Sequence, residues 1–178
     1  MAPSNTPRAA PTVLLPAAPA GTGVATARVR LDSPVGGLEI EATDEAIVAV
    51  YWVDDPRGPP DVTDPLLTEA RDQLAAYFAY RLAAFDLPLA PAGSPFERDV
   101  WRQMCDIPFG ETMTYGEMAT AVGGMARAVG SACGANPIPV IIPCHRVLGA
   151  GNRMVGYSGR GRIETKRWLL VHEGALLV

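Results

Sequence analysis

The sequence has few of the residues that hold disulfide-rich, metal-binding or membrane proteins together. Three cysteines and two histidines occur among 178 residues. So sparse a set forms no disulfide framework, no two cysteines have zinc-ribbon spacing, and a zinc site is hard to assemble. No apolar run approaches the roughly 20 residues that cross a bilayer, which excludes a membrane span. We therefore expect a folded protein in a reducing cytoplasm, without metal or membrane attachment.

Net positive charge is also lacking, although charge is unevenly divided along the chain. The formal net charge is −4 and the pI is about 5.1, values that argue against a nucleic-acid partner. Residues 1–91 contain 6 Arg and Lys against 12 Asp and Glu, a balance of −6, whereas residues 92–178 contain 9 against 7, a balance of +2. Six of these nine basic residues lie between positions 144 and 167. Such asymmetry indicates either an interaction surface or a solvated helix face without a partner.

Composition divides the chain into three parts. Residues 1–22 are rich in alanine and proline, and we expect a disordered tail there. Residues 23–91 combine strand-like alternation with a helix predicted after Asp64 and Pro65, an N-cap followed by proline at the first helical position. Residues 92–178 have mainly helical signals. The sequence therefore predicts an α+β protein, with a small N-terminal sheet-and-helix lobe and a helical C-terminal lobe.

Further local signals place the elements within each lobe. The continuously apolar run 47–53 favours a buried strand. Ser94 with Glu97, and Thr114 with Glu117, form two capping boxes that predict helix starts. A short helix over 125–133 follows a two-glycine turn, and this pair of helices predicts a winged helix-turn-helix-like unit. The same pattern is common in ordinary helical proteins, so alone it does not establish DNA binding.

Cys144 is the sharpest candidate for chemistry. A cysteine reacts as its thiolate, and a free pKa of about 8.5 leaves only a small fraction ionised at neutral pH. His145 and Arg146 follow directly and place a base and a permanent cation in the same turn, while Pro143 restricts the backbone before the thiol. The competing interpretation is an inert packing cysteine that continues the apolar run 140–142.

The other candidate residues have weaker signals. Cys105 and Cys133 lie on predicted helices and are interpreted as packing residues, although Cys133 could line a pocket. His172 lies in the last turn of the final helix, where the helix dipole favours a cation, and a structural role is preferred for it. Glu173 lies at the same end, where the dipole disfavours a negative charge. It therefore suggests a compensating partner such as His145, the alternative being a solvated surface glutamate.

Four motifs follow one another in the second half of the chain. They are 136–139 (NPIP), 143–147 (PCHRV), 157–159 (YSG) and 168–174 (WLLVHEG). This ordered set resembles the signature of the O6-alkylguanine-DNA alkyltransferases, also called methylated-DNA–protein-cysteine methyltransferases. The likeness is dense from Phe96 to Ala175 and looser over the N-terminal lobe.

The resemblance implies DNA repair by a suicide reaction. The alkyl group of an O6-alkylguanine, flipped out of the duplex, would pass irreversibly to Cys144 without a cofactor. His145 would act as base through a water, and Glu173 would orient its imidazole. Asn136 would brace the turn that holds the cysteine, and Tyr115 would protonate the leaving guanine. Activity on O4-alkylthymine, preference for bulky groups and cooperative assembly on DNA stay open.

The resemblance also implies a guanine pocket. Ser158 would lie near the O6 atom, and the backbone carbonyls of Cys144 and Val147 would accept hydrogen bonds from the exocyclic amine. The residues implied to bind the substrate are Tyr157, Ser158, Gly159, Val147, Pro139 and Cys133.

A DNA-binding surface is implied around the third helix of the C-terminal region. Arg127 would enter the base stack, and the small neighbours Ala126 and Ala128 would let the helix lie in the minor groove of double-stranded DNA. Further contacts are implied for Tyr115 and, within the basic stretch after Cys144, for Arg146 and Arg160. We expect the protein to bind as a monomer.

Some positions depart from the family pattern. Ala135 stands where many members have glycine or a basic residue, and Arg160 stands where a small residue is usual, which puts tolerance of bulky alkyl groups in doubt. Because no Cys or His precedes Cys105, the zinc ligands of human-type members are missing and no zinc is expected.

Three other functions compete with alkyl transfer. A non-catalytic lesion-binding relative would lack the acceptor cysteine. A transcriptional regulator would need an added domain, for which a 22-residue tail is too short. A cysteine hydrolase takes its histidine from a distant chain position, unlike the adjacent pair Cys144 and His145. The sequence therefore favours alkyl transfer.

Overall fold

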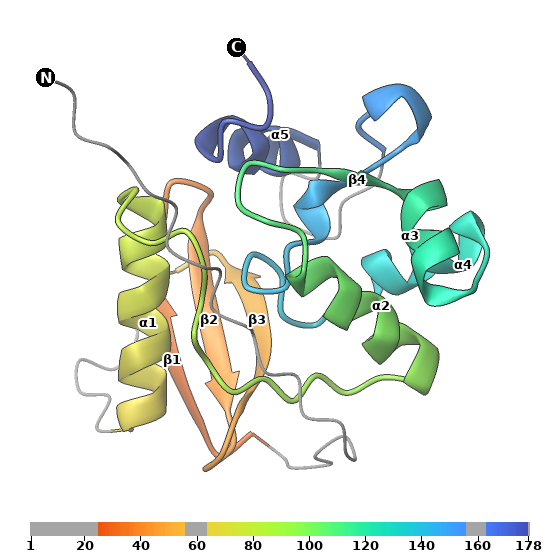
Figure 1. Cartoon of the computed structure of the whole chain (residues 1–178). Helices are drawn as coiled ribbons and strands as arrows, with labels where there is room; N and C mark the ends of the chain where they lie inside the picture. The colour runs from red at the N-terminus through yellow and green to blue at the C-terminus, as the bar shows by residue number, and fades with distance from the viewer. Residues whose placement is uncertain (1–24, 56–63, 156–162, 178) are drawn as a thin grey trace, which may run out of the picture.

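The structure is a computed structural model that describes residues 25–55, 64–155 and 163–177. Figure 1 shows a sheet with one long helix beside it, next to a cluster of shorter helices. The α+β class predicted from the sequence is confirmed. The expectations for the tail 1–22 and for positions 157–160 lie outside the described residues.

The N-terminal lobe is a three-stranded antiparallel sheet covered by one helix. The strands β1 (Ala27–Leu31), β2 (Gly37–Ala42) and β3 (Ile47–Val53) lie in sequence order. The helix α1 (Pro65–Phe78) begins as predicted, because Asp64 Oδ1 accepts the Leu67 N–H at 2.9 Å. The apolar side of α1 is buried in the core through Leu67, Ala70, Leu74, Tyr77 and Phe78.

The prediction that β3 is a buried strand is only half right. Val50 is buried, but the neighbouring Tyr51 is 49% exposed. Side chains alternate between the two faces of a sheet, and Tyr51 pairs with Glu39, whose carboxylate accepts a hydrogen bond from Arg30 at 2.6 Å. That face of the strand is therefore polar, although the residues of β3 are apolar in sequence. The Val50 N–H donates to the Pro137 carbonyl at 2.9 Å, so β3 joins the N-terminal lobe to the NPIP motif.

Four helices build the C-terminal lobe. They are α2 (Pro95–Cys105), α3 (Tyr115–Val122), α4 (Ala126–Gly134) and α5 (Ile163–His172). Both predicted capping boxes are present at the starts of α2 and α3. Gly123, at a φ of 69°, ends α3 in the left-handed conformation, so that α4 can turn back against it. Among the helices that the structure describes, none is long and apolar enough to cross a membrane.

A short parallel strand pair, which the sequence did not predict, connects the helix pair to the cysteine motif. The strand β4 (Met113–Thr114) pairs with β5 (Val147–Leu148). Because β4 runs directly into α3, this pairing places Tyr115 at the start of the helix near the residues that follow Cys144. Figure 1 shows α3 and α4 on the side of the molecule away from the sheet.

Candidate active site

The segment before the cysteine is a compact turn held by one buried side chain. Asn136 Nδ2 donates to the Ile142 carbonyl at 2.9 Å, and its Oδ1 accepts the Ile138 N–H at 3.0 Å. Val140 has a φ of 74°, which is strained for a β-branched residue. Asn136 therefore joins two backbone positions of the turn that precedes the cysteine.

Cys144 begins a single 3₁₀ turn that ends at Arg146. The residue is 3% exposed, and its N–H donates to the Ile142 carbonyl at 2.9 Å. Burial, together with the nearby Cys144, raises the pKa of the Cys133 thiol to about 12. Burial, Cys133 and Cys144 raise the pKa of Tyr115 to about 12. The phenol therefore keeps its proton at neutral pH.

His145 is buried and in contact with Glu173. Its Nε2 lies 2.8 Å from Glu173 Oε1. Burial lowers the pKa of His145, against the opposing pull of Glu173, so the imidazole is neutral at pH 7. A neutral ring that donates Nε2–H to the carboxylate has its lone pair on Nδ1. That Nδ1 atom is buried and has no hydrogen-bond partner among the residues described.

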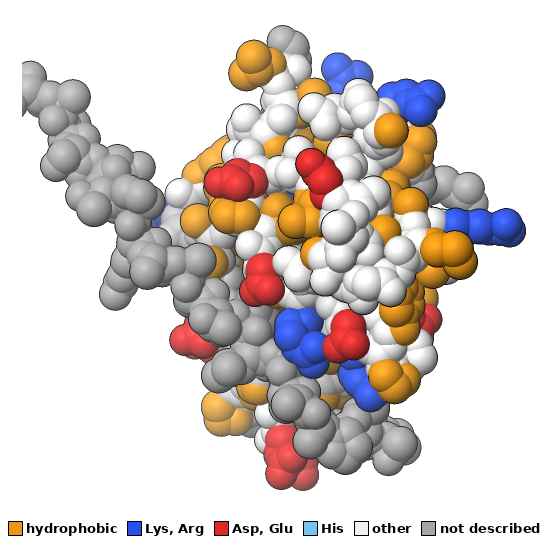
Figure 2. Space-filling model, turned by 45° about the vertical axis from the view of Figure 1, so that its right-hand side comes forward, with side chains coloured by type: hydrophobic (Ala, Val, Ile, Leu, Met, Phe, Trp, Pro, Cys, Tyr) orange, Lys and Arg blue, Asp and Glu red, His pale blue; other side chains and the backbone are white. Residues whose placement is uncertain are grey.

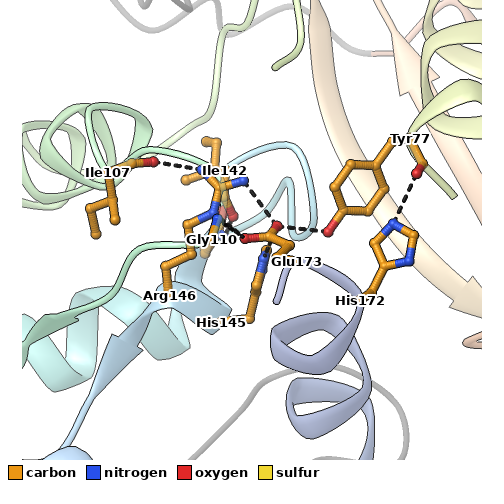
Figure 3. A network of polar contacts seen from close by, with 9 residues as sticks. Tyr77, Ile107, Gly110, Ile142, His145, Arg146, His172 and Glu173 are labelled. Carbon is orange, nitrogen blue, oxygen red and sulfur yellow. Dashed lines mark hydrogen bonds and ion pairs between the residues drawn. The ribbon is translucent and has the colours of Figure 1, made fainter. Parts of the chain in front are cut away.

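Glu173 is the centre of a buried network drawn in Figure 3. Its Oε1 accepts hydrogen bonds from Tyr77 Oη at 2.8 Å and from Arg146 Nη2 at 2.9 Å, besides the contact with His145. Its Oε2 accepts from Arg146 Nε at 2.8 Å and from the Gly110 N–H at 3.4 Å. Burial alone would raise the pKa of this carboxyl, but His145 and Arg146 together hold it well below its ordinary value. The group is therefore a carboxylate at neutral pH.

The position of Arg146 contradicts its predicted role in DNA binding. The residue is 7% exposed, and its guanidinium forms a two-pronged ion pair with Glu173. Its Nη1 donates to the Ile107 carbonyl at 2.6 Å. A buried arginine whose donors are engaged in this way cannot reach a phosphate, so the prediction is wrong. Arg146 instead compensates the buried charge of Glu173.

Lys166 is a second member of the basic stretch that does not lie on the surface. Its Nζ donates to the carbonyls of Val147 at 2.6 Å and Val155 at 3.3 Å. Burial lowers the pKa of Lys166, while the thiols of Cys144 and Cys133 act in the opposite direction. Together with Arg146, this burial removes two cations from the expected DNA-facing charge. Arg153 and Arg167 are exposed.

The chain matches known proteins over both lobes. Residues 95–175 match the family model described as 6-O-methylguanine DNA methyltransferase, DNA binding domain, and residues 29–91 match the ribonuclease-like domain of the same name. The chain belongs to this family. The resemblance seen in the sequence motifs is thereby confirmed.

Several methyltransferases of the family are similar in sequence or structure. The methylated-DNA–protein-cysteine methyltransferase of Mycolicibacterium paratuberculosis is 42% identical over 149 residues, covering 80% of this chain and 89% of that protein. The Shigella flexneri protein of the same name is 49% identical, but the match covers 60% of this chain and only 63% of that protein. The structure of Mycobacterium tuberculosis OGT in complex with DNA aligns with a TM-score of 0.73 and 40% identity, over 83% of this chain and 92% of that one.

The residues expected to bind DNA lie on and beside α4. Arg127 and Ala126 are exposed in its first turn, Ala128 is half-buried, and the half-buried Tyr115 donates from Oη to the Val155 carbonyl at 3.3 Å. On the side shown in Figure 2, Lys and Arg side chains are scattered among apolar and uncharged atoms instead of forming one basic patch. Positive charge on this side of the molecule is therefore less concentrated than the sequence predicts.

The expected guanine-binding residues are only partly described. Val147 and Pro139 are buried close to Cys144, and Cys133 completes this group at the end of α4. The Val147 carbonyl, expected to bind the guanine amine, already accepts a hydrogen bond from the Lys166 ammonium at 2.6 Å. The predicted residues Tyr157, Ser158, Gly159 and Arg160 lie outside the described part of the chain.

Three contributors to the network were not predicted from the sequence. They are Tyr77, Gly110 and the Ile107 carbonyl. Tyr77 is 96 positions from Glu173, and it fits the apolar stripe of α1 like an ordinary core residue. Of these three, only Gly110 could have been noticed in the sequence, as a glycine in a turn. Its φ is 82°, and an added Cβ would lie 2.9 Å from the Glu173 carbonyl oxygen.

Proposed function

We propose that this chain repairs DNA by transferring the alkyl group of O6-alkylguanine to its own Cys144, once per molecule. The observation that carries the proposal is the buried contact of 2.8 Å between His145 Nε2 and Glu173 Oε1, directly beside that cysteine. It provides a neutral base next to a thiol, with a carboxylate placed to stabilise the charge that the base acquires. Membership of the family supports the same reaction.

Thiol activation begins at His145. Its Nδ1 lone pair takes the Cys144 proton through a bridging water, and the resulting imidazolium is stabilised by Glu173. The carboxylate does not take the proton itself, because His145 and Arg146 together keep the pKa of Glu173 low. Asn136 holds the turn before the cysteine and so fixes the direction in which the sulfur faces.

Alkyl transfer is an in-line displacement at carbon. The thiolate sulfur forms a bond to the alkyl carbon while the bond from that carbon to guanine O6 breaks, and the electron pair stays on the base. Tyr115, whose pKa of about 12 keeps it protonated, supplies a proton or a hydrogen bond to the leaving guanine. The product is a thioether that has no easy return path, so each chain acts once and needs no cofactor.

The guanine must leave the duplex to reach this buried cysteine. Extrusion costs a few kcal/mol, which Arg127 offsets by entering the stack from the minor groove. The proposed pocket consists of Tyr157, Ser158, Gly159, Val147, Pro139 and Cys133. One chain binds double-stranded DNA as a monomer, and its affinity falls with salt. O4-alkylthymine is a second candidate substrate of the same pocket.

Mass measurement of the protein after reaction tests the proposal. The full chain is incubated with a duplex that contains one O6-methylguanine, and the masses of the intact protein and its peptides are determined. We expect a single methyl increment on the peptide with Cys144 and none in Cys144→Ser. Cys105→Ser is the matched control and should be methylated like the wild type, because that half-buried thiol ends α2 and has a pKa raised by burial to about 12.

Two results would overturn the proposal. Methylation of another residue would remove Cys144 as the acceptor. Tight binding of the damaged duplex without any mass increase would instead identify a lesion-binding protein that performs no chemistry.

A further inference from the structure

We propose that Tyr77, which belongs to the N-terminal lobe, is a positioning residue of the alkyl-transfer site. It acts on Glu173, and through Glu173 on the imidazole of His145. The inference rests on the proposed function, because it assumes that these two residues activate Cys144. It makes the N-terminal lobe part of the reaction machinery and not only a neighbour of it.

The contact between Tyr77 and Glu173 is direct and fully buried. Tyr77 Oη donates to Glu173 Oε1 at 2.8 Å, and the same oxygen lies 2.8 Å from His145 Nε2. Tyr77 has no solvent exposure. Burial and the adjacent carboxylate raise the pKa of the phenol far above its ordinary value, so it always presents a proton to Oε1. Figure 3 shows the phenol and the imidazole meeting at this carboxylate.

Two consecutive residues at the end of α5 hold both ends of the tyrosine. His172 Nε2 lies 2.9 Å from the Tyr77 carbonyl oxygen, and Glu173 accepts the hydroxyl. One bond therefore fixes the last turn of α1 and the other fixes the phenol. A tyrosine that only filled space in the core would need neither hydrogen bond. Together the two bonds set the distance between α1 and the Glu173 carboxylate.

Aromatic neighbours fix the orientation of the phenol ring. The ring centroid lies 5.3 Å from that of Phe78, 5.4 Å from that of Phe85 and 6.1 Å from that of Phe109. A ring restrained in this way has already lost its rotamer freedom, so its hydroxyl holds Glu173 at little further entropic cost.

The hydroxyl opposes a competing attraction on the carboxylate. Arg146 contacts both oxygens of Glu173 and attracts the whole group toward its guanidinium. Tyr77 restrains Oε1, the oxygen that serves His145. Without that donor, we expect the carboxylate to keep its contact with His145 but to move more freely, so that the imidazole loses its fixed orientation.

The test compares Tyr77→Phe with Tyr80→Phe in the full chain. The first substitution removes only the hydroxyl that contacts Glu173. The second removes a hydroxyl from the same aromatic cluster, since the Tyr80 ring lies 4.0 Å from the His172 ring and the residue is 71% exposed. The readouts are the rate constant of methyl transfer from the damaged duplex across pH and the midpoint of urea unfolding.

We expect Tyr77→Phe to react about 10-fold more slowly, the size of effect typical of a lost hydrogen bond to a charged group. Its rate-against-pH midpoint should move to higher pH, because a carboxylate with one donor fewer attracts the His145 proton more strongly. Glu173, Arg146 and Lys166 are the charged groups that set this midpoint. Tyr80→Phe should leave both the rate and the midpoint unchanged.

A purely structural role predicts a different outcome. An unchanged rate in Tyr77→Phe, or a loss explained by its unfolded fraction with the pH midpoint unmoved, would overturn the inference. If Tyr77→Phe does not fold, 3-fluorotyrosine at position 77 replaces it. Its hydroxyl is a stronger donor, so the pH midpoint should move down, and an unmoved midpoint counts against the inference.

Reaction of Cys144 with iodoacetamide separates this inference from the proposed function. The reagent reports thiol activation without DNA. If the wild type transfers no methyl group but Tyr77→Phe still slows carbamidomethylation of Cys144 and moves its pH midpoint, the proposed function fails and the role of Tyr77 stands. If methyl transfer occurs and neither readout responds to Tyr77→Phe, the role of Tyr77 fails alone.

Discussion

Lys166 supplies a buried ammonium group that interacts electrostatically with the thiol that is proposed to react. Lys166 has no exposed surface, and its electrostatic interaction with Cys144 and Cys133 acts on the thiols as well as on the lysine. A fixed cation favours the thiolate over the thiol. The two carbonyls that accept its protons hold it in place, so it contributes charge to the site and not to a DNA-facing surface.

Lys166→Met should therefore make Cys144 less reactive. The substitution keeps most of the length of the side chain and removes its charge, and a thiol pKa one unit higher leaves about 10-fold less thiolate at pH 7. The rate of Cys144 carbamidomethylation by iodoacetamide between pH 5 and 9 measures the change. Arg167→Met is the matched control, because it removes the next cation along α5 from an exposed position. Equal profiles for Lys166→Met and the wild type would show that the ammonium group does not act on the thiol.

The two buried cations also show what sequence reasoning misses at the residue scale. Arginine and lysine are almost always exposed unless they are paired, so the basic stretch that contains both predicts charge on the surface. Their partners come from distant chain positions: Glu173 and the Ile107 carbonyl for Arg146, and two carbonyls for Lys166. No local pattern signals such pairings.

At the scale of elements, local signals were sufficient for the helices. The capping boxes at Ser94 and Thr114 depend only on residues three positions apart, and both helices begin where these boxes predict. The pair β4 and β5 was missed because each strand has two residues, too few to show alternation. That missed pair matters for function, since it brings the start of α3 next to the cysteine motif.

The helix α4 leads to a prediction about base flipping. Arg127→Ala should slow methyl transfer from duplex DNA by about 10- to 100-fold, because flipping costs a few kcal/mol that the side chain no longer offsets. Reaction with free O6-benzylguanine should stay at the wild-type rate, since no base has to leave a stack. Arg71→Ala, on α1 in the other lobe, controls for a general loss of positive charge. Equal losses on both substrates would exclude the role in flipping.

At the scale of the whole molecule, Glu173 joins parts of the chain that the sequence keeps far apart. The carboxylate contacts Tyr77 of α1, the Gly110 turn and both residues that follow Cys144. The overall charge of −4 gave no indication of this buried polar centre. The family motifs identified His145 and Glu173, but the link to the N-terminal lobe depends on tertiary structure that no motif encodes.

This buried centre makes the stability of the fold depend on pH in a defined direction. The folded-state pKa of His145 is lowered, chiefly by burial, below its unfolded value of about 6.5. A group whose pKa is lower in the folded protein than in the unfolded chain stabilises the fold at pH values above the unfolded pKa. That stabilisation is lost as the pH falls toward the folded pKa. The folded-state pKa of Glu173 is also lowered. Its contribution to stability is therefore lost in the same way, once the pH falls below its unfolded pKa of about 4.3.

We therefore expect the free energy of unfolding to fall between pH 7 and pH 5, where histidines titrate and carboxylates do not. Because Tyr77 and Arg146 join both lobes to the same carboxylate, the lobes should lose structure together. Urea unfolding followed by circular dichroism and tryptophan fluorescence at each pH measures both effects. His145→Gln keeps a hydrogen-bonding side chain that cannot be protonated, so its unfolding free energy should decline less over this range. A decline as steep as that of the wild type would assign the acid sensitivity to another group.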